Sequence, residues 1–489
     1  MRNTQRTLLG TATLALAIAP ALAAPGDYDP MTPARPSAGY LNDYLRQDHA
    51  SMAAWDLGVA ARVRYEVHDG YGIAGKGGPA ADFRDTGADV QNNYLLYRIR
   101  PHVGYSSEWF SAYVEGRHSG EENDERKPNP EADDFDLHQA YVIIGNHKEF
   151  PLSLKIGRQE MIYGDERLIG ASGFNNVGRT FDAAKLRWQN SWFGVDFFTS
   201  RVVLPDNHNF NMSSDYDYFS GAYFNSKLIP KQTTEWYFLA RNASAAASSY
   251  PATTSQVVGS ARDIYTVGFR AKSNPGELNG WDYTAEIMGQ FGHYNDPALP
   301  QGSRSLEQQA YAIVALGGYT FTDVKFTPRV GLEYDYGSGD HNPNDNKHET
   351  FENLFPTNHK FYGFMDFASL QNLQDVRVSS SAKFLPRLGV TADYHSFFLA
   401  DQHDNFYTVL GARRGGIATT PGTGYGINPT YNSYVGSELD LITTYTISPQ
   451  AVAEVGFGHF FTGKYIDQSL SVPGTKDANW VYVSLNVNF

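Results

Sequence analysis

Apolar and polar residues alternate with a period of two along most of the chain. In the segment 56–67, Val63 and Tyr65 share one parity whereas Arg64 has the other, and the last ten residues, 480–489, alternate in the same way. Successive side chains of a β-strand point to opposite faces. Each of these segments therefore predicts a strand with one apolar and one polar face.

The alternation recurs in a regular order: about ten residues of strand pattern, a short turn, another strand, then a longer polar loop. This order is typical of antiparallel outer-membrane barrels with short periplasmic turns and long extracellular loops. The pattern predicts an all-β fold, a single antiparallel transmembrane β-barrel of about 18 strands, in which the last strand pairs with the first. The strands are expected to begin near residues 56, 93, 109, 136, 151, 181, 192, 217, 232, 263, 280, 307, 323, 372, 386, 434, 450 and 480.

The first 23 residues have the features of a secretory signal peptide: Arg2 and Arg6, an apolar stretch, and Ala21-Leu-Ala23 as a cleavage site. Residues 24–53 carry no clear period and are expected to form a periplasmic lead-in, and residues 54–489 the barrel. A secreted chain without a further long apolar segment can cross a membrane only as strands.

Composition supports a barrel and disfavours several kinds of partner. The chain has 46 glycines, 32 tyrosines, 30 phenylalanines and no cysteine. Aromatic residues form the interfacial girdles of membrane barrels. The formal net charge of -14 makes nucleic acid an unlikely partner.

Three polar segments, 119–134, 337–366 and 401–432, are long enough to fold into the lumen and narrow it. The pattern does not say which of them does so. The run Asp340–Glu349 is rich in oxygen ligands but lacks the glycine and spacing of a calcium loop, so it is expected to be a solvated loop. No metal and no cofactor is predicted.

The inward faces of the predicted strands carry many basic residues, although the protein is acidic overall. Rings of basic groups select anions in pores, so these residues predict a pathway for an anionic solute. The basic residues are Arg62, Arg64, Arg98, Arg100, Arg117, Arg158, Lys185, Arg187, Arg270, Lys325, Arg329, Arg377 and Arg387. The alternative is that they pair with inward carboxylates and only fill the barrel. Candidate partners are Glu66, Glu115, Asp196, Glu286, Glu333, Asp335, Asp393, Glu438 and Asp440.

A charged loop between two strands, within residues 155–188, holds the densest set of polar residues. It contains Arg158, Arg167 and Arg179 beside several carboxylates, and the preceding strand is expected to break at Gly157. A solvent-exposed loop does not require so many charged residues close together. The pattern therefore favours a network of charged side chains inside the barrel wall. An enzyme is not predicted, because His395 and Ser396 would point to opposite faces of a strand and could not act together.

Four motifs resemble those of the alginate export family of bacterial outer-membrane proteins: GRQEMIYGDERLIG, NNVGRTFDAAKLRW, GVTADYHSFF and GSELDLITTY. They occur in the family's order, and the resemblance spans residues 95–489. It implies a monomeric 18-stranded barrel with an electropositive pore, through which an anionic exopolysaccharide such as alginate leaves the cell. On the family's pattern, the residues in or near the pore are Arg158, Arg167, Arg179, Lys185, Arg187, Arg387, Glu438 and Asp440.

The sequence thus predicts a passive outer-membrane channel for an anionic polysaccharide or oligosaccharide, with export as the expected direction of transport. Two alternatives stay open: a substrate-selective uptake porin for small anions or sugars, and a non-conducting barrel that serves as an adhesin or anchor. The expected partners are outer-membrane lipid, the anionic saccharide and a periplasmic secretion partner.

Overall fold

The computed structural model describes most of the chain from residue 39 onward. The described residues are 39–72, 83, 90–127, 129–146, 149–244, 261–295, 304–414, 425, 427–470 and 477–489. The predicted signal peptide lies outside this range.

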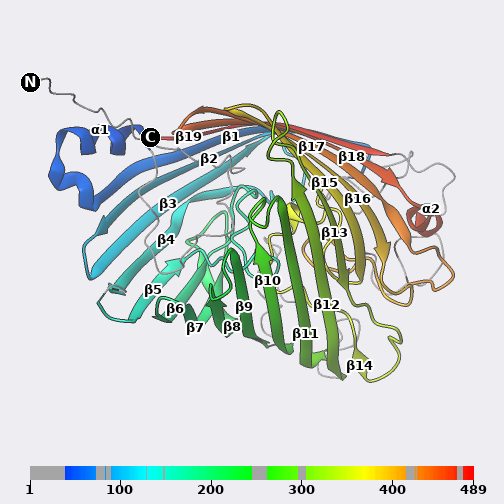
Figure 1. Cartoon of the computed structure of the whole chain (residues 1–489). Helices are drawn as coiled ribbons and strands as arrows, with labels where there is room; N and C mark the ends of the chain where they lie inside the picture. Colours follow the sequence, from blue (N-terminus) through cyan, green and yellow to red (C-terminus); the bar gives the residue numbers. More distant parts are fainter. Residues whose placement is uncertain are drawn as a thin grey trace, which may run out of the picture.

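Across the described residues, 18 antiparallel strands form one closed wall (Figure 1), as the alternation predicts. The first nine are β1 (Trp55–Asp69), β2 (Gln91–Ser106), β3 (Phe110–Glu122), β4 (Asp133–Gly145), β5 (Leu152–Gln159), β6 (Phe181–Gln189), β7 (Phe193–Leu204), β8 (Met212–Ser226) and β9 (Gln232–Ala243). The others are β10 (Arg262–Ser273), β11 (Trp281–Asn295), β12 (Ser305–Thr320), β13 (Arg329–Gly337), β15 (Leu373–Leu385), β16 (Leu388–Leu399), β17 (Tyr434–Ser448), β18 (Ala451–Thr462) and β19 (Ala478–Asn488). A two-residue strand, β14 (Lys347–His348), pairs in parallel with β12.

The last strand closes the barrel against the first. β19 pairs antiparallel with β1, with Val63 opposite Leu485 and Tyr65 opposite Val483. These four apolar side chains share the outer face, since residues directly opposite each other in a sheet project to the same side. The predicted closure of the sheet is confirmed.

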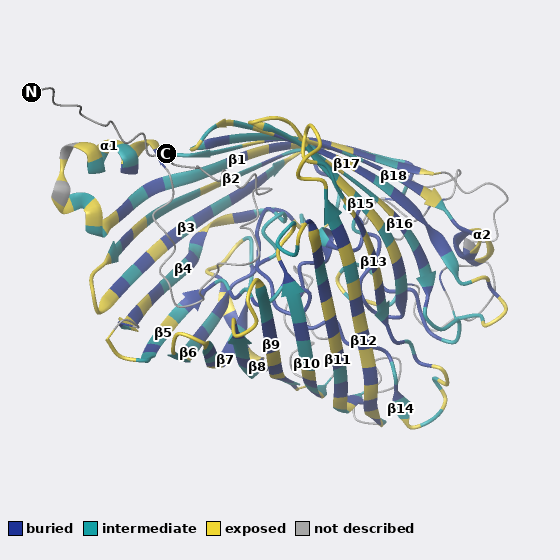
Figure 2. Cartoon of the chain, in the orientation of Figure 1, coloured by how far each residue is buried: buried dark blue, intermediate teal, exposed yellow. Residues whose placement is uncertain are grey.

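The two faces of the wall differ as the alternation predicts. Val63 and Tyr65 are exposed on the outside, whereas Arg64 between them is 1 % exposed and points inward. Exposed and buried residues alternate along the strands in Figure 2, most clearly on β11 and β12. The outer face is therefore the lipid-facing surface of a membrane barrel.

Two strand boundaries and one break differ from the prediction. β8 begins at Met212 and β13 at Arg329, not near 217 and 323. Phe326 and Thr327 have φ values of 74° and 45°, which belong to a turn and not to an extended strand. The strand β5 does not break at Gly157: it continues to Gln159, with Gly157 at φ 128°, where an added Cβ would lie 2.1 Å from the Ala140 carbonyl oxygen.

A short helix, α1 (Tyr40–Asp48), and a 3₁₀ turn, η1 (Ala50–Ala54), precede β1. The Asn42 amide donates to Asp56 at 2.6 Å and accepts the Leu57 backbone N–H at 2.6 Å. β19 pairs with β1 only from Ala60 onward, so the first residues of β1 have no β19 neighbour. The helix α1 lies beside these residues. The helix thus satisfies part of an open strand edge. Among the described residues, no helix is long and apolar enough to cross a membrane.

Two long connections fold into the barrel and build a core there. They are the β5–β6 loop, residues 160–180, and the β13–β15 loop, residues 338–372, which contains β14 and the 3₁₀ turn η3 (Asn358–Lys360). Phe355 packs edge-on against two wall residues, Phe181 at 5.2 Å and Phe219 at 5.0 Å between ring centroids. Of the three loops singled out by length, the one beginning at 337 fills the lumen, and the other two line the cavity beside it. The β5–β6 loop, not counted among the three, also fills the lumen.

Candidate functional site in the barrel lumen

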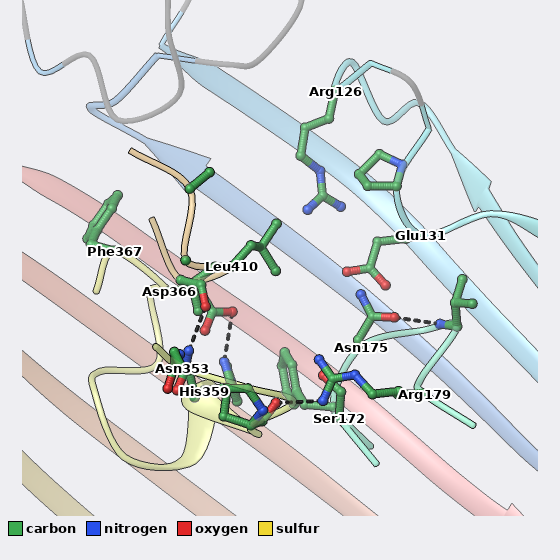
Figure 3. A pocket seen from close by; sticks show the side chains of 18 of the residues that line it. Arg126, Glu131, Ser172, Asn175, Arg179, Asn353, His359, Asp366, Phe367 and Leu410 are labelled. Atoms are coloured by element: carbon green, nitrogen blue, oxygen red, sulfur yellow. Dashed lines mark hydrogen bonds and ion pairs between the residues drawn. The ribbon is translucent and has the colours of Figure 1, made fainter. Parts of the chain in front are cut away.

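A large cavity lies inside the barrel, between the infolded loops and the wall (Figure 3). Its volume is about 1160 Å³. Its lining comes from strands β1, β2, β9, β10, β11 and β19 and from the β1–β2, β3–β4, β5–β6, β7–β8, β13–β15 and β16–β17 loops. Long and short connections alternate around the barrel, and all these loops are on the long-loop side. That side is extracellular in outer-membrane barrels, so the cavity is an outer vestibule of the lumen.

The vestibule is rich in cations. Its lining includes eight arginine and lysine residues, Arg64, Arg126, Lys127, Arg179, Arg241, Arg262, Arg413 and Arg414, against four carboxylates, Glu66, Glu131, Glu352 and Asp366. The protein as a whole has a formal charge of -14. The lining thus has more cationic than anionic side chains, although some of its arginines pair with carboxylates beside it, Arg126 with Asp124 and Arg241 with Asp217.

Arg179 illustrates how the fold holds these cations. Its guanidinium donates to the backbone carbonyl oxygens of Gly170 at 3.0 Å, Phe355 at 2.7 Å and Pro356 at 2.8 Å. Burial, together with the charge of Arg241, lowers the pKa of Arg179 to about 10, so the group stays charged at neutral pH. Figure 3 shows Arg179 at the floor of the vestibule, below Glu131 and Arg126. The contacts tie the two infolded loops together with a charge that carbonyl dipoles stabilise.

The carboxylates on the lining are held by neighbouring donors. Glu352 accepts from Arg262 at 2.5 Å and from Arg241 at 3.3 Å, which fastens the β13–β15 loop to strands β9 and β10. Glu131 accepts the Asn176 backbone N–H at 2.5 Å, and burial raises the pKa of Glu131 above its usual range. These acids are thus structural partners of the loops as well as part of the lining.

An aromatic ring bridges the wall and a loop at the vestibule. The Phe174 ring lies 3.8 Å from the Arg64 guanidinium carbon and 3.8 Å, centroid to centroid, from the stacked His359 ring. His359 in turn contacts Asp366 at 3.0 Å, and Trp480 lies edge-on to Phe174 at 6.0 Å. The Arg64 guanidinium and the His359 ring both pack against Phe174, so this ring joins the β5–β6 loop to the wall and to the β13–β15 loop.

Most of the residues predicted to line the pathway do lie on the inner face of the wall. Those on strands are Arg62, Arg64, Arg98, Arg100, Arg117, Arg158, Lys185, Arg187, Arg270, Arg329, Glu333, Asp335, Arg377, Asp393, Glu438 and Asp440. Arg167 and Arg179 lie in the β5–β6 loop, buried inside the barrel as the charged network required. Of all these residues, the vestibule lining includes Arg64 and Arg179.

Many of the inward arginines pair with carboxylates, which is the alternative that the sequence left open. The pairs include Arg100–Glu160 at 3.3 Å, Arg158–Asp182 at 2.8 Å, Arg187–Asp196 at 2.7 Å, Arg270–Asp165 at 2.6 Å and Arg329–Asp282 at 2.5 Å, as well as Arg117–Asp133 and Arg377–Glu333. A paired arginine contributes less field to a passing solute than an uncompensated one. Five of these seven pairs join two strands of the wall, and the other two, Arg100–Glu160 and Arg270–Asp165, fasten the β5–β6 loop to the wall.

Arg62 and Arg98 use carbonyl groups in place of carboxylates. They are direct cross-strand partners on β1 and β2 and bear like charges. Both donate to the Gly173 carbonyl oxygen, at 3.1 and 3.3 Å, and Arg98 also reaches the Asn175 carbonyl at 3.1 Å. The two guanidinium groups therefore grip the backbone of the β5–β6 loop.

Two predicted pathway residues are not on the inner face. Lys325 lies in the turn between β12 and β13, and Arg387 in the turn between β15 and β16, and both are exposed. The prediction assumed that inward and outward positions keep alternating through both turns. In a turn the backbone is not extended, so the alternation does not hold there. Arg387 instead donates to the carbonyl oxygen of Ile447, near the end of β17, at 3.1 Å.

Several lining residues were missed. Arg241 and Arg262 could have been found from the alternation. Trp236 and Phe238 point outward on β9, so Arg241, at the opposite parity, points inward. Arg262 has the same parity on β10 as the inward Arg270. The other missed lining residues lie in loops, where no period applies: Arg126, Lys127, Glu131, Glu352, Asp366, Arg413 and Arg414.

Comparisons with known proteins agree with this geometry. A family model described as alginate export matches residues 56–475. Solved structures with a similar fold include a BenF-like porin from Pseudomonas fluorescens Pf-5, 12 % identical, with a TM-score of 0.55 over 89 % of this chain and 99 % of that one. Pseudomonas aeruginosa OpdK, solved with vanillate, is 11 % identical, with a TM-score of 0.53 over 89 % and 98 % of the two chains. A search of curated proteins gave no match.

Proposed function

Because the chain belongs to the alginate export family and is a bacterial outer-membrane channel protein, we propose that it conducts an anionic polysaccharide or oligosaccharide by passive diffusion. The observation that carries this proposal is the excess of cations over carboxylates in the vestibule of an acidic protein. A cationic lining offsets the cost of desolvating carboxylates as they enter a confined space. We also propose that a single chain forms the channel and that a periplasmic partner delivers the polymer to it.

The lining chemistry supports transient binding of a charged sugar. A guanidinium group can bind a carboxylate with two parallel hydrogen bonds, and the lining carries several of these groups. Glu131 and Asp366 accept hydroxyl groups and repel carboxylates, which keeps each binding step weak enough for release. This combination suits a solute that carries both hydroxyl and carboxylate groups.

A second candidate function is the uptake of small organic anions. It is favoured by the packing of Phe355 against Phe181 and Phe219, which fills part of the lumen beside the vestibule of about 1160 Å³. The similar fold of OpdK, solved with vanillate, supports the same reading. Export of a polymer requires the infolded loops to leave a continuous path, whereas a small anion can pass in steps.

Single-channel recording in planar bilayers tests these proposals. We expect anion selectivity in a salt gradient, and block by oligouronates that deepens with chain length while neutral oligosaccharides of equal length have no effect. Neutralising the vestibule with Lys127→Gln and Arg179→Gln should weaken both effects; Arg201→Gln, outside the lining and paired with exposed Asp215, is the control.

The other outcomes separate the alternatives. Equal block by monomeric and oligomeric uronates would support uptake of small anions and contradict polymer export. A channel that selects cations would contradict the proposed role of the basic lining residues in attracting anions. A folded protein with no conductance would support the non-conducting barrel.

A further inference from the structure

Two histidines and one aspartate from separate extracellular loops converge at the outer end of the barrel. His341 belongs to the β13–β15 loop, and Asp401 and His403 to the β16–β17 loop. The His341 Nδ1 lies 2.9 Å from Asp401 Oδ2, and the His403 Nδ1 lies 2.9 Å from Asp401 Oδ1. The potential ligand atoms of the three residues lie within 4.8 Å of one another, and the imidazole centroids are 5.0 Å apart.

We propose that these three side chains form a binding site for a divalent transition-metal ion, with Zn²⁺ as its representative. Imidazole nitrogens with one carboxylate are a usual donor set for Zn²⁺, whereas Ca²⁺ and Mg²⁺ require mostly oxygen ligands. Three protein ligands leave a fourth position for water, so the site does not need further side chains. The sequence predicts only a solvated loop at His341, because Asp401 and His403 lie 60 or more residues further along the chain.

The spacing of the donor atoms fits an ion without a rearrangement of the backbone. The donor atoms of a tetrahedral zinc site lie roughly 3.3 to 3.5 Å apart. Through side-chain rotation, the two Nδ1-to-carboxylate distances of 2.9 Å need to open by about half an ångström, and the widest donor separation, within 4.8 Å, needs to close. On binding, the ion replaces the protons that the two Nδ1 atoms donate to Asp401.

The backbone of Asp401 is held by contacts that do not involve the imidazoles, and its carboxylate accepts the His403 backbone N–H at 2.8 Å. The Asp401 backbone N–H donates to the Asn372 side-chain oxygen at 2.7 Å, and the Asn372 amide donates back to the Asp401 carbonyl at 2.9 Å. Asn372 is fully buried. One ligand of the site is thus positioned before any metal arrives, which reduces the entropy cost of binding.

The two loops are also joined beside the site. The Asp340 backbone N–H, next to His341, donates to Asp404 Oδ2 at 3.0 Å. Thr350 donates to the same oxygen at 2.5 Å. These hydrogen bonds hold together the two segments that carry the histidines when no ion is bound. Removing one imidazole therefore does not separate the segments. The His341 side chain is 74 % exposed, so the ion has direct access from the medium.

The site cross-links two loops that both line the vestibule. Phe367 and Gln371 of the first loop, and Tyr407 and Leu410 of the second, are on the lining. A metal bridge adds a coordinate link to the hydrogen bonds between the loops. The inference does not depend on which solute the channel carries.

Isothermal titration calorimetry with ZnSO₄ tests the proposal, on full-length protein in detergent, purified without a polyhistidine tag and freed of metal with a chelator. We expect one site, at least tenfold weaker in His341→Ala and in His403→Ala, and unchanged in His208→Ala, which removes an exposed histidine of another extracellular loop. Co²⁺ should give a visible ligand-field band that both cluster variants lose. Heat-modifiable migration on gels confirms that each variant keeps its barrel.

Three results would overturn the proposal. The first is a wild-type protein that binds no Zn²⁺. The second is a His341→Ala or His403→Ala variant that binds Zn²⁺ as the wild type does. The third is displacement of Zn²⁺ by equimolar Ca²⁺, which would indicate an oxygen-ligand site elsewhere.

Discussion

Arg167 reaches across the lumen to Glu333. Its loop starts from β5, yet the guanidinium pairs with Glu333 and, at 2.8 Å, with Asp335, two residues apart on the inner face of β13. The Arg167 and Glu333 side chains are 3 % and 2 % exposed. The contact fastens the β5–β6 loop to the far wall through one buried cation.

Replacing Arg167 with alanine should release this loop and destabilise the barrel. Loss of one partner of a buried ion pair leaves uncompensated charge and costs about 3 to 5 kcal/mol. We expect a lower midpoint in urea unfolding and a larger, noisier single-channel conductance. Arg201→Ala, which removes a largely exposed pair with Asp215, should change neither measurement appreciably. An unchanged conductance in Arg167→Ala would show that the tether does not restrict the lumen.

Asn176 is a second fastening point, and its loss should be costly. Its side chain is fully buried, donates to the carbonyl oxygens of Tyr97, Gly120 and Glu131 at 3.0 to 3.2 Å, and accepts from Arg62 at 3.2 Å. Each buried polar group left without a partner costs about 1 to 3 kcal/mol. We expect Asn176→Ala to speed proteolysis of the β5–β6 loop. Asn344→Ala, an exposed asparagine of another loop, is the control.

Glu160 should make the attachment of this loop sensitive to acid. Burial opposes its ionisation, but the hydrogen bond with His138 and the charge of Arg100 prevail and lower the pKa of Glu160 to about 2. A carboxyl group with a depressed pKa stabilises the fold above its unfolded pKa, and this contribution is lost as the pH falls from about 4.5 to about 2. The contribution is at most about 3 kcal/mol.

Urea midpoints measured between pH 6 and pH 2 check this expectation. The wild type should lose more stability over the lower half of this range than Glu160→Gln, whose amide does not titrate there. Parallel pH curves for the two proteins would contradict the assignment.

Gly268 should tolerate no side chain, because the ring of Tyr237 on the neighbouring strand covers it. A Cβ at Gly268 would lie 2.2 Å from that ring, and the Tyr237 hydroxyl continues across to donate to Glu286 at 2.6 Å. Overpacking of this kind costs about 1 to 3 kcal/mol. We expect Gly268→Ala to lower the melting temperature in detergent. Gly317→Ala, where nothing lies within 4 Å of the added Cβ, should melt like the wild type.

The barrel wall was predictable because the face to which each side chain points depends only on the alternation of residues along its own strand. Parity alone places Arg64 inside and Val63 outside, and pairing with β19 follows from the apolar face of the last strand. The prediction failed where it was carried past a strand end, as at Lys325 and Arg387, since a turn does not preserve parity.

The interior was less predictable because its contacts join distant parts of the chain. The charge density of residues 158–182 did indicate a buried network. Nothing in that segment indicated that Arg179 would bond to the carbonyl oxygens of Phe355 and Pro356, or that His341 would meet Asp401. Such contacts depend on how the loops fold, which no short-range period encodes.

The position of α1 has a consequence for the order of folding. Gln450, in the turn before β18, donates to Asp43 of the helix at 2.6 Å, while Asn42 holds the start of β1. These partners are more than 400 residues apart in sequence and become neighbours only when the seam between β1 and β19 has formed. The helix can therefore attach to β1 through Asn42 as soon as that segment folds, whereas its bond from Gln450 forms only once the cylinder has closed.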